Sequence, residues 1–166
     1  MALLDEEVVE YWLNNNGFFC MRGVKTGLGE IDFLAIRPNE NGLECWQVEV
    51  TVSFRPIGYI GGASTAKKRD AQELEQGVEQ YIHKKFTSDK KIQKREDILP
   101  GATWQYVLVC AEARHEQEIQ LFKEKGIRVY RYKELLGELE TTTSQVNSTA
   151  GNILEILRYM KKADKN

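Results

Sequence analysis

The 166-residue sequence has no apolar run that approaches the roughly 18 residues needed to cross a membrane, so no membrane contact is expected. Its first residues are acidic, whereas a secretory signal begins with basic ones, so we expect no such signal. Cysteine is scarce: Cys20, Cys45 and Cys110 stand far apart in apolar segments, and no Cys-x-x-Cys pair occurs. These features argue against a structural zinc site and predict reduced core thiols in a cytoplasmic protein.

Several common catalytic groups are also missing. His83 and His115 stand alone in charged segments, and no Ser-His-Asp or Cys-His set can be assembled. The glycines at 58, 61 and 62 lack the Lys-Ser/Thr ending of a nucleotide-binding loop. The carboxylates therefore remain as the groups most informative about chemistry.

The charge is nearly balanced overall but unevenly placed. The chain has 23 basic and 25 acidic residues, for a net charge of -2. Residues 67–95 carry nine basic and five acidic side chains, so this segment is positive within an acidic chain. It is either a contact surface for nucleic-acid phosphates or a solvated helix face and loop. The candidate phosphate contacts are Lys67, Lys68, Arg69, Lys90, Lys91 and Lys94.

The first half of the sequence predicts a helix, three strands and a second helix. Apolar spacing indicates a helix over residues 5–16 that ends at an Asn-Gly stop. Tight turns then join strands at 18–24, 29–36 and 43–52 into an antiparallel meander. After a glycine-rich connection, Ser64 or Thr65 is expected to cap a long helix that ends near Lys85.

The second half predicts a charged loop at 87–101 followed by a buried strand, then further elements at 114–125, 127–132 and 133–139. Residues 1–140 form one predicted domain, and 141–166 form a tether with a last amphipathic helix at about 152–162. That helix is expected to pack on the domain, on a second copy of the chain, or on another protein. The order αβββαβ with an appended αβα predicts an α/β fold with helices around a mixed sheet.

Two carboxylates lie inside apolar strand sequences. Asp32 is the only charged residue between Ile31 and Ile36, and Glu49 is the only one in the run from Trp46 to Thr51. Burial of an unpaired carboxylate is costly, so each acid needs a partner. A hairpin places the two strands side by side, and a cation between the acids would relieve their repulsion. Oxygen ligands suit Mg²⁺ or Mn²⁺; the alternative is an ion pair with a nearby residue such as Arg22 or Lys25.

These residues resemble a known nuclease superfamily. Gly-Glu-Ile-Asp at 29–32, followed by Gln-Val-Glu-Val-Thr at 47–51, is similar to the PD-(D/E)xK pattern. The nearest likeness is to a small bacterial family related to archaeal Holliday-junction resolvases, and it covers about residues 5–110. It implies a restriction-endonuclease-like αβββαβ core.

The resemblance also implies roles for individual residues. Asp32 and Glu49 correspond to the ligands of Mg²⁺ or Mn²⁺, and the carbonyl of Val50 lies at the edge of that site. Glu6 corresponds to an acid on the first helix that reaches the metal, often through water. A second alignment register, Gln47-x-Glu49, instead places Glu49 at the position of the family lysine.

The sequence departs from this family at its lysine. The pattern requires lysine two residues after the glutamate, but Thr51 stands there. Lys67 is the candidate replacement, because it is spaced from Ala71 and Leu74 so as to face the sheet on a helix.

We therefore expect a Mg²⁺-dependent endonuclease that hydrolyses phosphodiester bonds in DNA, including branched or structured DNA. The alternative is a catalytically impaired DNA- or protein-binding module on the same fold, because of Thr51.

Overall fold

The computed structural model describes residues 4–52, 58–62, 67–113, 115–142 and 148–163. The chain folds around five strands, which are β1 (Phe19–Thr26), β2 (Gly29–Asn39), β3 (Gly42–Thr51), β4 (Trp104–Cys110) and β5 (Arg128–Arg131). The helices are α1 (Leu4–Asn15), α2 (Ala71–Ile82), a short π-helix η1 (His83–Thr87), α3 (Asp89–Ile98), α4 (Glu116–Glu124), α5 (Tyr132–Thr141) and α6 (Thr149–Ala163).

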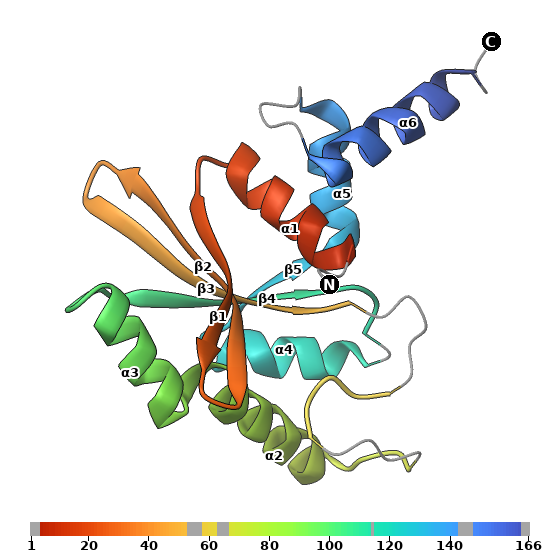
Figure 1. Cartoon of the computed structure of the whole chain (residues 1–166). Coiled ribbons are helices and arrows are strands. Elements are labelled where there is room, and N and C mark those ends of the chain that lie inside the picture. Colours follow the sequence, from red (N-terminus) through yellow and green to blue (C-terminus); the bar gives the residue numbers. More distant parts are fainter. Residues whose placement is uncertain (1–3, 53–57, 63–66, 114, 143–147, 164–166) are drawn as a thin grey trace.

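The five strands form one mixed sheet in the order β1-β2-β3-β4-β5 (Figure 1). The first three strands are antiparallel neighbours, as expected from the tight turns between them. β4 and β5 each run parallel to the preceding strand in the sheet, because α2, η1, α3 and then α4 carry the chain back between them. This arrangement confirms the predicted α/β class with a mixed sheet flanked by helices.

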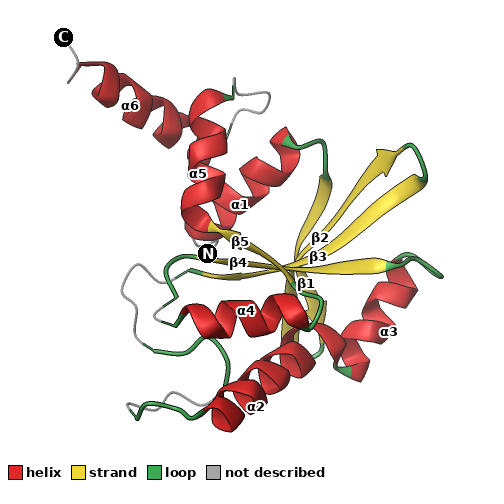
Figure 2. Cartoon of the chain, turned by 180° about the vertical axis from the view of Figure 1, so that it is seen from behind, coloured by secondary structure: helices red, strands yellow, loops and turns green. Residues whose placement is uncertain are grey.

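Helices cover both faces of the sheet (Figure 2). On one face, Trp12 and Leu13 of α1 pack with Leu135 of α5 against apolar side chains of the central strands. On the other face, Val78 of α2 and Phe122 of α4 pack against β4. Ile98 at the end of α3 joins a smaller apolar cluster of β1 and β2. Glu49 and Gln47 lie on this second face.

Two predictions about the segment 64–101 were wrong. α2 begins at Ala71, because the Asp70 side chain accepts a hydrogen bond from the Glu73 backbone N–H while the Glu73 carboxylate accepts one from the Asp70 N–H. The expected caps, Ser64 and Thr65, lie outside the described residues. The expected loop at 87–101 contains α3, whose inward face is formed by Lys91 and Arg95 in place of apolar residues.

The C-terminal helix packs on the domain through its first half. Ala150 and Leu154 are buried in the same apolar cluster as α1 and α5. The second half of α6 extends away from the sheet in Figure 1, with Leu157 and Tyr159 exposed. A partner for that half stays a prediction.

The apolar segments that hold the cysteines are strands of the sheet. Cys45 and Cys110 are buried, Cys20 is half-buried, and all three are free thiols. Among the described residues, no helix is both long and apolar enough to span a membrane.

Two leucines of α6 give a matched test of this packing. We predict that Leu154→Ala lowers the free energy of unfolding by about 2–3 kcal/mol, because it leaves a cavity against α1 and α5. Leu157→Ala, three residues along the same helix and 49% exposed, should change it by less than about 0.5 kcal/mol. Denaturant unfolding measures both, and equal effects would show that α6 does not pack on the domain as described.

Candidate functional site

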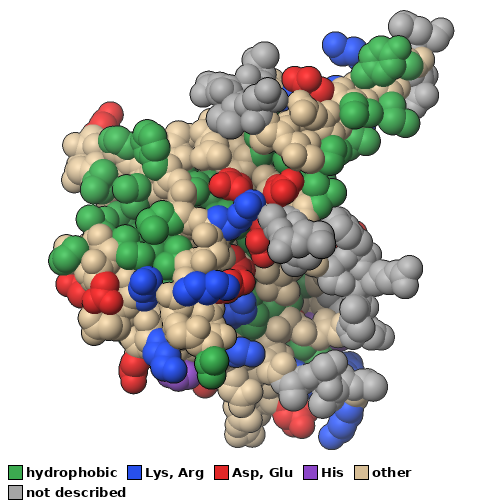
Figure 3. All heavy atoms as spheres, in the orientation of Figure 1, with side chains coloured by type: hydrophobic (Ala, Val, Ile, Leu, Met, Phe, Trp, Pro, Cys, Tyr) green, Lys and Arg blue, Asp and Glu red, His purple; other side chains and the backbone are tan. Residues whose placement is uncertain are grey.

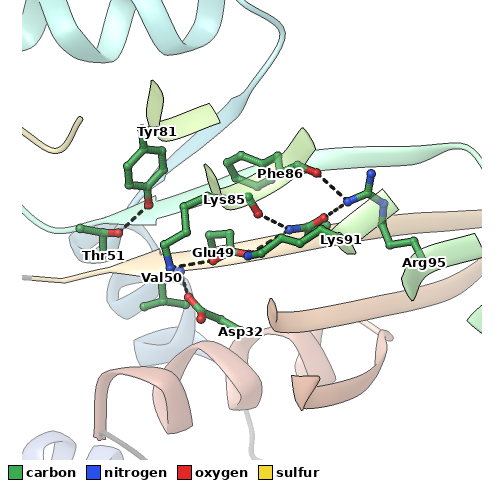
Figure 4. A network of polar contacts seen from close by, with 10 residues as sticks. Asp32, Glu49, Val50, Thr51, Tyr81, Lys85, Phe86, Lys91 and Arg95 are labelled. Atoms are coloured by element: carbon green, nitrogen blue, oxygen red, sulfur yellow. Dashed lines mark hydrogen bonds and ion pairs between the residues drawn. The ribbon is translucent and has the colours of Figure 1, made fainter. Parts of the chain in front are cut away.

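A fully buried carboxylate lies at the centre of the sheet. Glu49 on β3 is 0% exposed, and both of its oxygens are bound (Figure 4). Its Oε2 accepts from Lys85 Nζ at 2.9 Å, and its Oε1 accepts from Lys91 Nζ at 2.8 Å and from Gln47 Nε2 at 2.9 Å. Glu49 is therefore ion-paired, as in the alternative to a metal site that the sequence allowed. Its partners, however, are Lys85 of η1 and Lys91 of α3, and not Arg22 or Lys25.

A second set of hydrogen bonds holds these partners in place. Gln47 lies two residues before Glu49 on the same face of β3, and its Nε2 also donates to the Lys85 carbonyl at 2.7 Å. Arg95, which is buried on α3, donates to Gln47 Oε1, to the Phe86 carbonyl at 2.8 Å and to the Tyr106 hydroxyl at 3.0 Å. Gln47 thus positions Glu49 and joins β3 to η1 and α3.

Asp32 lies beside Glu49 on the neighbouring strand. The β2–β3 pairing places Phe33 opposite Val48, and continuing this register by one residue places Asp32 opposite Glu49. Asp32 Oδ2 accepts from the Val50 backbone N–H at 2.7 Å. The structure therefore brings together the two strand acids that the sequence singled out.

The surroundings of Asp32 disfavour its charged form. Burial, and then the negative charge of Glu49, raise the pKa of Asp32 from an ordinary value of 3.8 to about 6. Lys85 and the Val50 N–H act in the opposite direction, and Glu6 adds to the increase. Desolvation and the charge of Glu49 thus outweigh the support that Lys85 and the Val50 N–H give to the charged form of Asp32.

Glu6 on α1 lies close enough to join this electrostatic cluster. Partial burial raises its pKa first of all, followed by the charges of Asp5 and Glu30, while Lys85 lowers it. Glu6 in turn raises the pKa of Asp32, so the two carboxylates interact. Over the described parts of the chain, however, no three His, Cys, Asp or Glu side chains form a ready metal-binding group.

Lys85 is the cation that links these acids. Burial alone would lower its pKa, but Glu49 and Asp32, with Glu30 further away, raise it above the ordinary value. Its side chain is 28% exposed, whereas that of Lys91 is 6% exposed. One lysine therefore lies at the opening of the site and the other inside it.

Thr51, two residues after Glu49 on β3, bonds to another residue of the domain. Its hydroxyl lies 2.7 Å from the Tyr81 hydroxyl of α2 (Figure 4). This contact fixes the end of β3 to the helix that leads into η1. Thr51 therefore supports the site without supplying a charge to it.

The inward lysine was predicted at the wrong end of the helix. Lys67 precedes α2, is exposed, and lines a shallow hollow with Gly62 and Gln76 that includes neither strand acid. Lys85, in contrast, continues the inward series of Leu74, Val78 and Tyr81 at helical spacing. The sequence signal for Lys85 was therefore present at the C-terminal end of the helix.

Two of the remaining predicted phosphate contacts stand in the loop before α2. Lys68 is exposed, whereas Arg69 is half-buried. The Arg69 guanidinium bonds the Gly61 carbonyl and lies over the Tyr59 ring, 4.4 Å from its centroid. Arg69 therefore holds the crossover loop in place.

The lysines of α3 also divide between surface and interior. Lys90 is exposed and Lys94 is half-buried, and both line an open hollow of about 510 Å³ beside the β1–β2 turn. Lys91 is buried against Glu49, so its prediction as a surface phosphate contact was wrong. Successive helix residues point about 100° apart, which explains why neighbours differ.

The fold assigns the protein to a structural class, the α/β domains with a five-stranded mixed sheet. No protein-family profile matches the sequence, and no curated protein matches it. The structure is similar to a crystal structure titled "Protein of Unknown Function AF1548", with a TM-score of 0.50 and 16% sequence identity. The match covers 96% of this chain and 77% of that one, and it supports the fold alone.

Adjacent lysines of α3 test the buried ion pair. Lys91→Met should lower the free energy of unfolding by about 3 kcal/mol, because it removes one of two cations from a fully buried carboxylate. Lys90→Met removes an exposed ammonium and should change stability by less than about 0.5 kcal/mol. Urea unfolding at neutral pH compares them, and equal stability of the two variants would contradict the pairing.

The pKa of Asp32 predicts how stability depends on pH. Between about pH 4 and pH 6 the native state keeps a proton on Asp32 that the unfolded state has released, so rising pH favours unfolding over this window. The free energy of unfolding of wild type should therefore fall by about 2 kcal/mol over this window, and that of Asp32→Asn should not. Asp32→Asn should then be more stable than wild type at pH 7.

Unfolding free energies at several pH values between 4 and 7 measure this effect. Asp97→Asn, at an exposed position on α3, serves as the control and should follow wild type. A wild-type profile that matches the Asp32→Asn profile would show that Asp32 has no raised pKa.

Proposed function

We propose that this chain is a metal-dependent nuclease that hydrolyses phosphodiester bonds in DNA, on a restriction-endonuclease-like fold of the PD-(D/E)xK type. The observation that carries the proposal is Lys85, whose Nζ lies 2.9 Å from Glu49 Oε2 and whose charge acts on Asp32. Two strand acids with one partly exposed lysine are the residue types of that superfamily. The order α1-β1-β2-β3-α2-η1-α3-β4, a helix and three strands followed by a helical crossover to a fourth strand, supports it as well.

The side chains fit a hard divalent cation in their chemistry. Asp32 uses only Oδ2 for a hydrogen bond within the described structure, and a bound cation would offset both the burial and the repulsion from Glu49 that raise its pKa. Asp32, Glu49, the Val50 carbonyl and, through water, Glu6 would hold Mg²⁺ or Mn²⁺. Glu49 would have to exchange Lys85 for the metal, because both of its oxygens carry lysine contacts.

Each residue of the site then has a distinct role. A bound Mg²⁺ or Mn²⁺ would supply an activated water and neutralise developing negative charge. Lys85, released from Glu49, places its ammonium on the phosphate in the transition state, which is the role of the missing strand lysine. Lys91 stays paired with Glu49 and offsets its negative charge. The Thr51–Tyr81 contact holds η1 at the correct distance from β3.

Positive charge near the site favours a nucleic acid as the substrate. Figure 3 shows Lys and Arg side chains gathered over β1 and the neighbouring part of α3. Lys25 and Lys90 are exposed there, beside the turn that leads into the strand of Asp32. Lysines suit contacts to phosphates without reading of base sequence. DNA should therefore lie across this surface.

A non-hydrolytic DNA-binding module is the second candidate. Lys85 and Lys91 already satisfy Glu49 without a metal, and this observation favours that reading. The two functions share a surface and differ in whether Asp32 and Lys85 are needed for bond cleavage.

Neighbouring lysines separate these functions. Lys85→Ala should reduce nicking of supercoiled DNA in Mn²⁺ or Mg²⁺ by a factor on the order of 100 or more, because it removes the side-chain cation proposed to contact the transition state. Lys84→Ala, at an exposed position next to it, should keep wild-type activity, as should Lys67→Ala. Asp32→Asn should be inactive. Melting temperatures confirm that each variant is folded.

The possible outcomes are distinct. Loss of activity in Lys67→Ala but not in Lys85→Ala would show that Lys67, as expected from the sequence, and not Lys85 acts as the catalytic lysine. Inactive wild-type protein that still binds DNA would favour the binding module. Cleavage that persists in Asp32→Asn would remove the nuclease assignment.

A further inference from the structure

The turn between β1 and β2 presents an apolar side chain directly to solvent. Gly27 and Leu28 form the two central residues, and the Thr26–Gly29 pair closes the hairpin. The positive φ of Gly27, +83°, is the value that a glycine at the first central position of a type II′ turn adopts. Leu28 is 105% exposed, the highest value among the large apolar residues of the described chain. It contributes nothing to the core.

Lysines of β1 and α3 lie beside the turn that carries this leucine. The Lys25 side chain is 77% exposed and pairs with Glu30, which is also partly exposed. A Cβ placed on Gly27 would lie 3.8 Å from the Lys90 ammonium, so α3 approaches the turn closely. The open hollow between the turn and α3 has lysines on both sides, together with two aspartates of α3. Lysines that can contact phosphates thus lie beside the turn that presents Leu28.

The turn also has a fixed position relative to the candidate catalytic acids. Leu28 and Asp32 are four residues apart on one hairpin, which corresponds to about 13 Å of extended chain. That length is roughly four base-pair steps of 3.4 Å. A DNA strand with one phosphate at Asp32 and Lys85 would therefore pass the tip of the turn within a few nucleotides.

We propose that Leu28 is a wedge that enters the DNA and separates two stacked bases near the bond to be cleaved. Proteins that bend DNA insert leucine and similar apolar side chains between base steps in this way, with basic residues holding the backbone on either side. The inference rests on the proposed function. It adds a substrate class, namely DNA in which a base step separates easily, at a mismatch, a branch point or a flexible pyrimidine–purine step.

Fluorescence of 2-aminopurine tests the wedge without cleavage. The intact chain is mixed, in EDTA, with a mismatched duplex that carries 2-aminopurine beside the mismatch, and binding is followed separately by anisotropy. Wild type should increase the fluorescence about threefold or more, because unstacking removes quenching by neighbouring bases. Leu28→Ala should bind with similar salt dependence but lose most of the increase, and Leu28→Trp should keep it.

An exposed leucine at the far end of the same sheet provides the control. Leu43 is 54% exposed at the start of β3, near the β2–β3 turn, and Leu43→Ala should behave as wild type. Binding without a fluorescence change in wild type, or an equal change in Leu28→Ala, would overturn the wedge and leave the proposed function standing. Absence of any salt-dependent DNA binding by wild type would overturn the proposed function, and the wedge with it.

Discussion

The structure depends on how a fully buried carboxylate is neutralised. Glu49 is fully buried near the C-terminal end of the central strand, where an isolated charge would be strongly unfavourable. Two lysines and one amide bind its oxygens, and each donor comes from a different element. β3 can therefore hold this acid only when η1 and α3 are folded against it. The same contacts that stabilise this side of the domain also assemble the candidate site.

The two lysines differ in a way that suits a functional site. Lys91 is enclosed, and its position is supported by Arg95 on the next turn of α3, which binds Gln47. Lys85 is partly exposed and lies near Asp32, so it can leave Glu49 while Lys91 remains. A buried ion pair contributes little net stability compared with apolar packing, because desolvation offsets most of its attraction.

Strand sequences predicted more of this arrangement than helix sequences did. The alternation around Glu49 and the apolar run around Asp32 placed both acids on adjacent strands, because strand period and hairpin pairing are local rules. α3 was missed because its buried face is formed by Lys91 and Arg95, so it has no apolar stripe to detect. Those two residues become an inward face only through Glu49 and Gln47, which are more than forty positions away in the chain.

The misplaced lysine has a different cause. The start of α2 was placed too early, although Asp70 and Glu73 carry the spacing of a capping box that marks the true start. Because Lys67 lies outside α2, helical spacing does not direct it toward the sheet. The same periodicity, followed beyond Tyr81, reaches Lys85. Helical spacing therefore predicts an inward lysine at the C-terminal end of the helix and not before its start.

A crystal structure of the protein soaked in Mn²⁺, with anomalous data, tests the central claim most directly. The account predicts an anomalous peak beside the Asp32 carboxylate, with Lys85 moved away from Glu49 and Lys91 still bound to it. An empty position at Asp32, with both lysines retained on Glu49 at high Mn²⁺ concentration, would contradict it.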